Sequence, residues 1–106
     1  MMSLFDDNIE WIQPGDSGAI SGTYRGKQEL AQLLAKMGEK QTSVTADRFL
    51  ADGDLVVVLG QSTVDGEITA QAQAITVRNG KAVRVQGYGD TAMQERIFGR
   101  KQVATG

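Results

Sequence analysis

The sequence predicts an α+β fold in which a curved antiparallel sheet packs on one main helix. The helix is indicated by apolar residues at the i, i+3, i+4 and i+7 positions of one face, namely Leu30, Leu33, Leu34 and Met37. The sheet is indicated by four strand-like segments that follow the helix and are separated only by short turns. Parallel strands would need helical crossovers between these segments, and the sequence has none there. A single domain spanning residues 1–106 is therefore expected.

A short strand and a glycine-rich loop are expected before the helix. Residues 9–13 alternate in the manner of a strand, and Pro14 ends it because proline cannot donate to the ladder. Residues 14–26 carry glycine at every third or fourth position, which predicts a loop. The helix is expected over residues 27–37, and Gly38 is a suitable residue for its end.

A meander of four antiparallel strands is expected after the helix. Its segments are residues 41–51, 54–64, 67–78 and 81–90. The dipeptides between them are Asp52-Gly53, Asp65-Gly66 and Asn79-Gly80. Asp-Gly and Asn-Gly adopt the positive φ angles of tight hairpin turns, so consecutive strands become antiparallel neighbours. A last helix is expected over residues 91–98, with an N-cap that is either Thr91, in a capping box with Gln94, or Asp90.

Composition and charge exclude several classes of function. The chain has no cysteine and no histidine, so thiolate nucleophiles, Ser-His-Asp triads and metal sites built from these residues are excluded. Acid–base chemistry would fall to Asp, Glu, Tyr or Lys, and we expect no metal and no cofactor. The net charge of −2 argues against nucleic acid as a partner. We expect no membrane span and a cytoplasmic location, because there is no long apolar run and no secretory signal pattern.

Several segments of the chain carry a family resemblance. They are Trp11-Ile12-Gln13-Pro14-Gly15, Gly22-Thr23-Tyr24-Arg25-Gly26, Asp52-Gly53-Asp54, Gly80-Lys81 and Tyr88-Gly89-Asp90-Thr91. Together they resemble the SnoaL-like, ketosteroid isomerase-related proteins of the nuclear transport factor 2-like superfamily, which has a cystatin-like fold. The resemblance implies a cone-shaped fold whose curved sheet surrounds a pocket. Family members usually begin with helices that close the open side of the cone, and residues 1–7 resemble only the tail of that region. A shortened N-terminal helical region is therefore expected.

The resemblance also implies that the pocket is lined by Trp11, Gln13, Gln71, Gln73 and Tyr88. In ketosteroid isomerase, an Asp base precedes the proline of the first strand, and a protonated Asp lies in the third strand of the meander. Gln13 and Gln73 occupy the matching positions here. Because an amide cannot take a proton from a substrate carbon at neutral pH, steroid isomerisation by that mechanism is not expected.

Some of these residues have competing interpretations. Asp90 matches the acidic residue that serves as acid or base in SnoaL-like cyclases, which implies a catalytic role, but it would equally serve as the cap of the last helix. Trp11 is either a wall on which a ligand stacks or an ordinary core residue. Gln71 and Gln73 either bind a ligand carbonyl or hydroxyl, or pair with each other across a subunit interface.

Two functions from different classes remain open. The first is a pocket for an apolar small molecule that contains a carbonyl group, on which the protein acts as a lyase, cyclase or isomerase with Asp90 as acid or base. The second is a non-catalytic ligand-binding or dimerisation module. Because a shortened cone would expose apolar sheet surface, we expect a homodimer that forms through the sheet face and closes both cavities.

Overall fold

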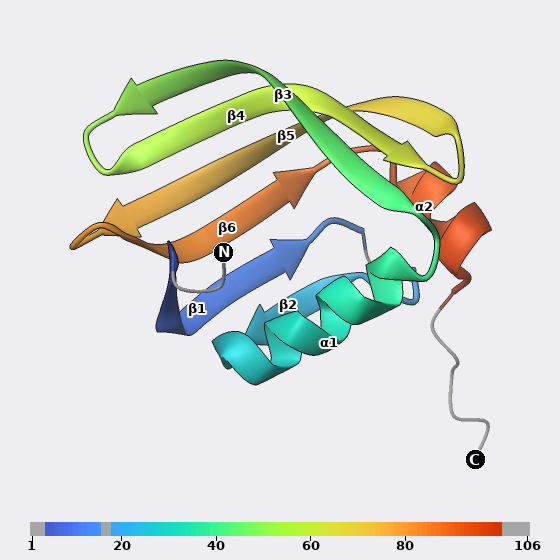
Figure 1. Cartoon of the computed structure of the whole chain (residues 1–106), viewed down its shortest axis with the longest axis horizontal. Helices are drawn as coiled ribbons and strands as arrows, with labels where there is room; N and C mark the ends of the chain where they lie inside the picture. Colours follow the sequence, from blue (N-terminus) through green and yellow to red (C-terminus); the bar gives the residue numbers. More distant parts are fainter. Residues whose placement is uncertain (1–3, 16–17, 101–106) are drawn as a thin grey trace.

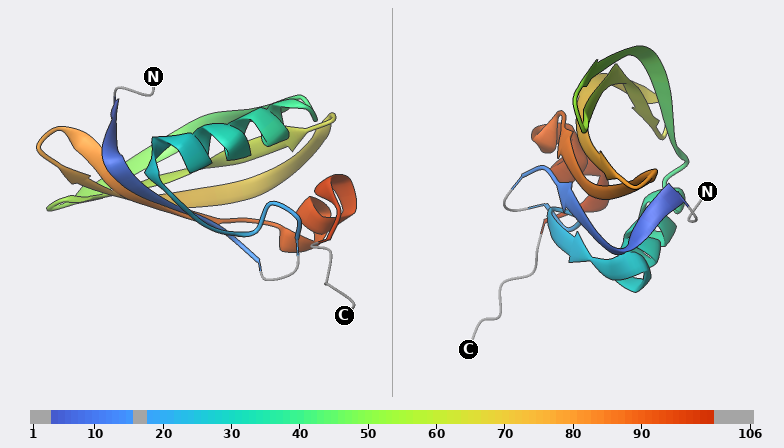
Figure 2. Two further views of the ribbon diagram at one scale, coloured as in Figure 1. Left: turned by 90° about the horizontal axis from the view of Figure 1, so that it is seen from below. Right: turned by 90° about the vertical axis from the view of Figure 1, so that its left-hand side faces the viewer.

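The computed structural model describes residues 4–15 and 18–100 of the chain. Its elements are the strands β1 (Phe5–Gln13), β2 (Gly22–Arg25), β3 (Thr42–Asp52), β4 (Leu55–Val64), β5 (Glu67–Arg78) and β6 (Lys81–Tyr88), and the helices α1 (Gly26–Gly38) and α2 (Thr91–Phe98). The strands form one sheet in the order β2-β1-β6-β5-β4-β3 (Figure 1). The sheet curls across this order, and α1 lies on the same side of it as the bend of β3 (Figure 2). The predicted α+β class is confirmed.

The four-stranded meander is also confirmed. Each of the strands β3 to β6 pairs antiparallel with the next one along the chain. The turn residues Asp65 and Asn79 have φ angles of 49° and 52°, and Gly66 and Gly80, which follow them, have φ angles of 82° and 76°. Two successive residues with positive φ form the tight turn that matches the twist of the flanking strands. The turn dipeptides therefore determine both the number and the direction of these strands.

The prediction of a continuous loop over residues 14–26 was wrong, because β2 lies within it. Thr23 and Tyr24 are residue types that favour strands, and Tyr24 pairs with Trp11 of β1. Gly22 and Gly26, with φ angles of 128° and 83°, let the chain enter and leave this short strand at sharp angles. Two of the glycines that suggested a loop thus flank a strand, with Gly22 at its start and Gly26 directly after it.

The sheet is not purely antiparallel, which corrects a second expectation. β1 pairs with β6 in parallel, with Trp11 beside Val85. β2 and α1 separate β1 from the meander, whose fourth strand then returns beside β1 in the same direction. β1 also begins earlier than expected, at Phe5, so residues 5–7 are strand and not the remnant of a helical region.

The core lies between α1 and one face of the sheet, which we call the inner face. Its fully buried side chains are Ile9, Ile20, Leu30, Leu33 and Val85. Ile75 of β5 pairs with Val85 and packs against this cluster. Because side chains alternate along a strand, Gln71 and Gln73 share the inner face with Ile75, whereas Ala72 and Ala74 lie on the outer face. The two glutamines of β5 therefore lie on the same face of the sheet as the core.

Candidate functional site

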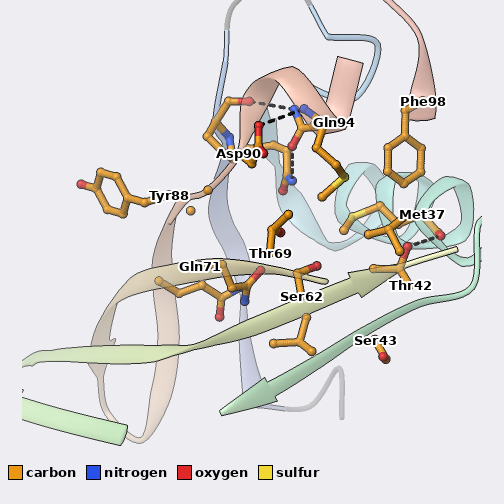
Figure 3. Close-up of a pocket in the computed structure, with 18 of the residues that line it drawn as sticks. Met37, Thr42, Ser43, Ser62, Thr69, Gln71, Tyr88, Asp90, Gln94 and Phe98 are labelled. Atoms are coloured by element: carbon orange, nitrogen blue, oxygen red, sulfur yellow. Dashed lines mark hydrogen bonds between the residues drawn. The ribbon is translucent and has the colours of Figure 1, made fainter. Parts of the chain in front are cut away.

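A cavity of about 430 Å³ opens between the end of α1, the inner face of the sheet and α2. Figure 3 shows side chains from each of these parts, including Met37, Gln71 and Gln94, around the same space. The apolar stripe of α1 divides between the core and this cavity. Leu30 and Leu33 are fully buried, whereas Leu34 and Met37 contribute to the cavity wall.

Two glycines of the chain after Val85 border this space. Gly87 pairs with Gln73, so both lie on the inner face, and Gly89 approaches Gln71 beyond the end of β6. A Cβ atom at Gly87 would lie 3.2 Å from Cδ of Pro14, which is a tight contact. A Cβ atom at Gly89 would meet Cβ of Gln71 at 3.8 Å, an ordinary van der Waals distance. The backbone at Gly87 is therefore packed closely against Pro14, and Gly89 lies beside Gln71 at the cavity.

The sheet surface under the cavity is polar but uncharged. Ser62 of β4 pairs with Thr69 of β5, and both line the cavity together with Gln71 and Gln73. No lysine or arginine occurs among the described residues of the lining, and Asp90 is the one carboxylate among them. Such a surface suits hydroxyl and carbonyl groups better than an anion.

Gln13 lies at one end of the cavity, and its amide is hydrogen-bonded to one residue of β1 and one of α2. Its Nε2 donates to Oε1 of Gln94 at 2.9 Å, and its Oε1 accepts from the indole nitrogen of Trp11 at 3.0 Å. Gln94 in turn donates to the carbonyl oxygen of Pro14 and to Oγ of Ser21, both at 2.9 Å. The side chain of Gln94 is 6% exposed, so α2 is joined to β1 by a buried amide. Sequence reasoning missed this residue, because its spacing from Thr91 suggested only a capping box.

Asp90 is the N-cap of α2, which decides between the two capping alternatives. Its Oδ1 accepts a hydrogen bond of 2.9 Å from the backbone nitrogen of Met93. The residue is exposed and borders the cavity at its rim. Asp90 thus caps the helix. Its carboxylate also lies at the cavity, which the predicted catalytic role requires.

Trp11 and Tyr88 differ in how they meet the cavity. Trp11 is half-buried and packs against the core, and its ring meets that of Phe5 edge-to-face with the ring centroids 6.2 Å apart. Trp11 also lines the cavity. It therefore combines the two interpretations. The ring of Tyr88 points away from the other labelled residues and is 57% exposed (Figure 3). Tyr88 pairs with Ala72 on the outer face, so it borders the cavity, as expected, while its ring points away from the cavity.

A surface ion pair connects α2 to the beginning of β5. The guanidinium of Arg96 donates to both carboxylate oxygens of Glu67, at 2.9 and 2.5 Å. This hydrogen bonding lowers the pKa of the Glu67 carboxyl. The pKa of Tyr24 shifts in the other direction, because burial of the phenol raises it. The hydroxyl of Tyr24 donates a hydrogen bond to the carbonyl oxygen of Ile20.

Residues 4–15 and 18–100 show neither a metal-binding cluster nor a membrane-spanning helix. These residues contain no group of three or more acidic, histidine or cysteine side chains placed to hold a metal ion. None of the helices found there has the length and apolar character to cross a membrane.

Solved structures with the same architecture include three that also share sequence. An NTF2-like protein from Burkholderia xenovorans LB400 is 31% identical, with a TM-score of 0.74 over 92% of this chain and 79% of its own. A protein of unknown function with a cystatin-like fold from Xanthomonas campestris is 27% identical, with a TM-score of 0.80 over 93% and 82% of the two chains. TerC, crystallised with polyporic acid, is 25% identical, with a TM-score of 0.80 over 92% and 82%. None of the curated proteins matches in sequence.

The family follows from a separate comparison of the sequence. The pattern of the SnoaL-like domain matches residues 1–89, which include β1 to β6 and the glycines beside the cavity. The solved structures agree with this match in fold. The chain therefore belongs to the SnoaL-like domain family and has the NTF2-like, cystatin-like fold.

Proposed function

We propose that this protein binds a largely apolar small molecule that carries a carbonyl or hydroxyl group. The observation that carries the proposal is the cavity of about 430 Å³, which combines apolar walls with a few neutral polar side chains. Ligand sites in proteins commonly have volumes of roughly 300–1,000 Å³ and this mixture of surfaces. Leu34, Met37, Met93 and Phe98 supply apolar wall, and Gln71 and Gln73 supply amides that suit a ligand oxygen.

The similarity to TerC supports the choice of ligand class. TerC is 25% identical to this chain and was crystallised with polyporic acid. Polyporic acid is therefore a sensible first probe, beside steroids, aromatic polyketides, terpenoids and phenolic acids.

The fluorescence of Trp11 provides the test. It is the one tryptophan in the chain and it lines the cavity, so a bound molecule should change its emission saturably. Gln73→Leu should weaken binding of the responding compound, because it removes an amide from the inner face. Thr76→Leu is the matched control, since Thr76 pairs with Leu55 and Arg84 on the outer face of the same strand. If the folded protein responds to no compound of the panel, the binding function is wrong.

A second candidate function is proton transfer by Asp90 next to a ligand carbonyl. It is favoured by one observation, the position of this carboxylate at the rim of a cavity whose other described polar groups are mainly neutral. Capping occupies Oδ1 with the Met93 amide, and Oδ2 would serve as the base.

Substitution of Asp90 separates capping from proton transfer. Asn is as good an N-cap as Asp but cannot act as a base, whereas Ala removes both properties. In D₂O, the wild type should incorporate deuterium next to the carbonyl of a bound ketone, and Asp90→Asn should bind that ketone without this exchange. Exchange at an equal rate in the wild type and the Asn variant would rule out Asp90 as the base.

We further propose a homodimer that forms through the outer face of the sheet. The cross-strand pairing places Leu50, Leu59, Ile68 and Tyr88 on this face, and all four are exposed. Apolar patches of this kind commonly mark an interface, and in a homodimer the patch would meet its own copy. The outer face lies opposite the cavity, so this contact differs from the expected one, which would have closed both cavities.

Light scattering at micromolar concentration tests the dimer. Ile68→Lys should shift the mass from dimer to monomer. Phe49→Lys is the control, because Phe49 is equally exposed but pairs with Val58 on the inner face. A wild-type protein that is monomeric at this concentration would contradict the proposal.

A further inference from the structure

The hydrogen bonds around Gln13 fix the direction of its amide. The indole N–H of Trp11 only donates, so the atom that it contacts in Gln13 must be the oxygen. The nitrogen of Gln13 then faces Oε1 of Gln94. At the other end, the carbonyl of Pro14 only accepts, so it must receive the nitrogen of Gln94. Turning either amide over would place donor against donor or acceptor against acceptor, and the chain of bonds therefore has one direction.

The remaining hydrogen-bonding capacity differs between the two amides. Both hydrogens of the Gln94 amide are used, one by Pro14 and one by Ser21. The amide nitrogen of Gln13 also carries two hydrogens, and in the described part of the chain only one of them has a partner, Gln94. Gln13 is half-buried and lines the cavity. Its second N–H is therefore a donor that is available to a molecule in the cavity.

We propose that Gln13 is the residue by which the cavity selects ligands with an acceptor oxygen, through a hydrogen bond from its second N–H. Gln94 is the positioning residue, because it holds the nitrogen of Gln13 on the side that the indole of Trp11 does not occupy. This inference rests on the proposed binding function and adds the chemical group that the ligand must present at this end of the cavity.

Gln71 and Gln73 differ from Gln13 in this respect. Both line the cavity, but neither side chain takes part in any side-chain hydrogen bond of the described residues. Such an amide can rotate and present either its oxygen or its nitrogen, so it discriminates little between donors and acceptors. The amide of Gln13 cannot rotate without breaking the bonds to Trp11 and Gln94. A ligand that lacks an acceptor would leave its N–H unpaired in a desolvated site, which lowers affinity.

Calorimetric titration with α-tetralone and tetralin tests the proposal. The two compounds share a bicyclic skeleton, and only the first has a carbonyl group. We expect the wild type to bind the ketone about ten- to a hundredfold more tightly, as for one desolvated donor gaining a partner. Gln13→Met should abolish this preference while tetralin binds as before. Gln94→Met should reduce it, because the amide of Gln13 becomes free to rotate. Gln61→Met is the control and should keep the preference, because Gln61 pairs with Ala70 on the outer face of the sheet.

The results separate the inference from the function on which it rests. Unaltered tetralin affinity and circular dichroism in each variant show that the cavity is intact, so a lost preference then reports the hydrogen bond. Equal affinity of the wild type for both compounds overturns the inference, as does a preference that survives Gln13→Met or that is lost as fully in Gln61→Met. If tetralin, the ketone and polyporic acid all fail to bind, the binding function fails and the inference fails with it.

Discussion

Substitution of Gly60 by Ala should destabilise the protein strongly, because two strands approach each other too closely there for any side chain. A Cβ atom at Gly60 would lie 2.0 Å from the carbonyl oxygen of Thr45, where real Cβ atoms keep at least 3.0 Å. The neighbour is backbone of β3, whose pairing with β4 is irregular between Ala46 and Arg48, and it cannot turn aside like a side chain. Relief of the contact requires β3 to move by about 1 Å, and we expect a cost of at least about 3 kcal/mol, the upper end for overpacking.

Urea denaturation followed by circular dichroism measures this cost. Since a domain of this size has a total stability of about 5–15 kcal/mol, the midpoint should fall markedly, and Tm should fall by at least about 12 °C. Gly38→Ala is the control, because a Cβ atom there meets nothing within 4 Å and Ala favours the helix. If Gly60→Ala had the urea midpoint and slope of the wild type, the close approach of β3 to Gly60 would not limit stability, and the reasoning would be refuted.

Three further predictions concern the surroundings of the cavity. Asp90→Ala should lower the free energy of unfolding by about 1 kcal/mol through loss of the cap, whereas Asp90→Asn should change it little, and urea denaturation distinguishes the two. Gly89→Leu should fill part of the cavity and weaken binding of any ligand in the Trp11 titration with little loss of stability, because its Cβ atom would make only an ordinary contact. Arg96 lowers the pKa of Glu67 below its ordinary 4.5, so this pair stabilises the fold above that pH and the contribution is lost as pH falls through the lowered value. The difference in urea midpoint between wild type and Glu67→Gln should therefore shrink at acid pH and in high salt, and a difference that is constant with pH would contradict the assignment.

The fold was predictable wherever a local pattern determines it. The turn dipeptides fixed the meander because Asp65-Gly66 and Asn79-Gly80 adopt positive φ wherever they connect two strands. The stripe of α1 was predictable from helical periodicity alone. β2 was not, because four residues between glycines carry too short a pattern, and Tyr24 becomes strand only through its pairing with Trp11. The parallel pairing of β1 with β6 was likewise invisible, since it depends on where the chain returns after the meander.

The candidate site was predictable to the extent that alternation along strands places residues on one face. Gln13, Gln71 and Gln73 reach the cavity because each lies on the inner face of its strand. The same alternation, applied to β6, turns Tyr88 outward, and only the pairing of Tyr88 with Ala72 reveals which face that is. Gln94 could not be found in this way, because its contact with Gln13 joins residues 81 positions apart and leaves no periodic signal.

An empty volume has no sequence pattern of its own, and the cavity shows why. Gly87 and Gly89 would be read as flexible points near the end of a strand, yet their effect depends on the residues opposite them, Gln73 and Gln71. A shift of the register by one residue would place alanines opposite the glycines. The amides of Gln71 and Gln73 would then no longer lie beside Gly89 and Gly87. The pairing of β5 with β6 therefore decides which side chains lie beside these glycines at the cavity. The turn at Asn79-Gly80, which was readable in the sequence, begins this pairing, but the register then shifts by one residue between Thr76 and Val77. That irregularity had no signal in the sequence, and the residues opposite Gly87 and Gly89 depend on it.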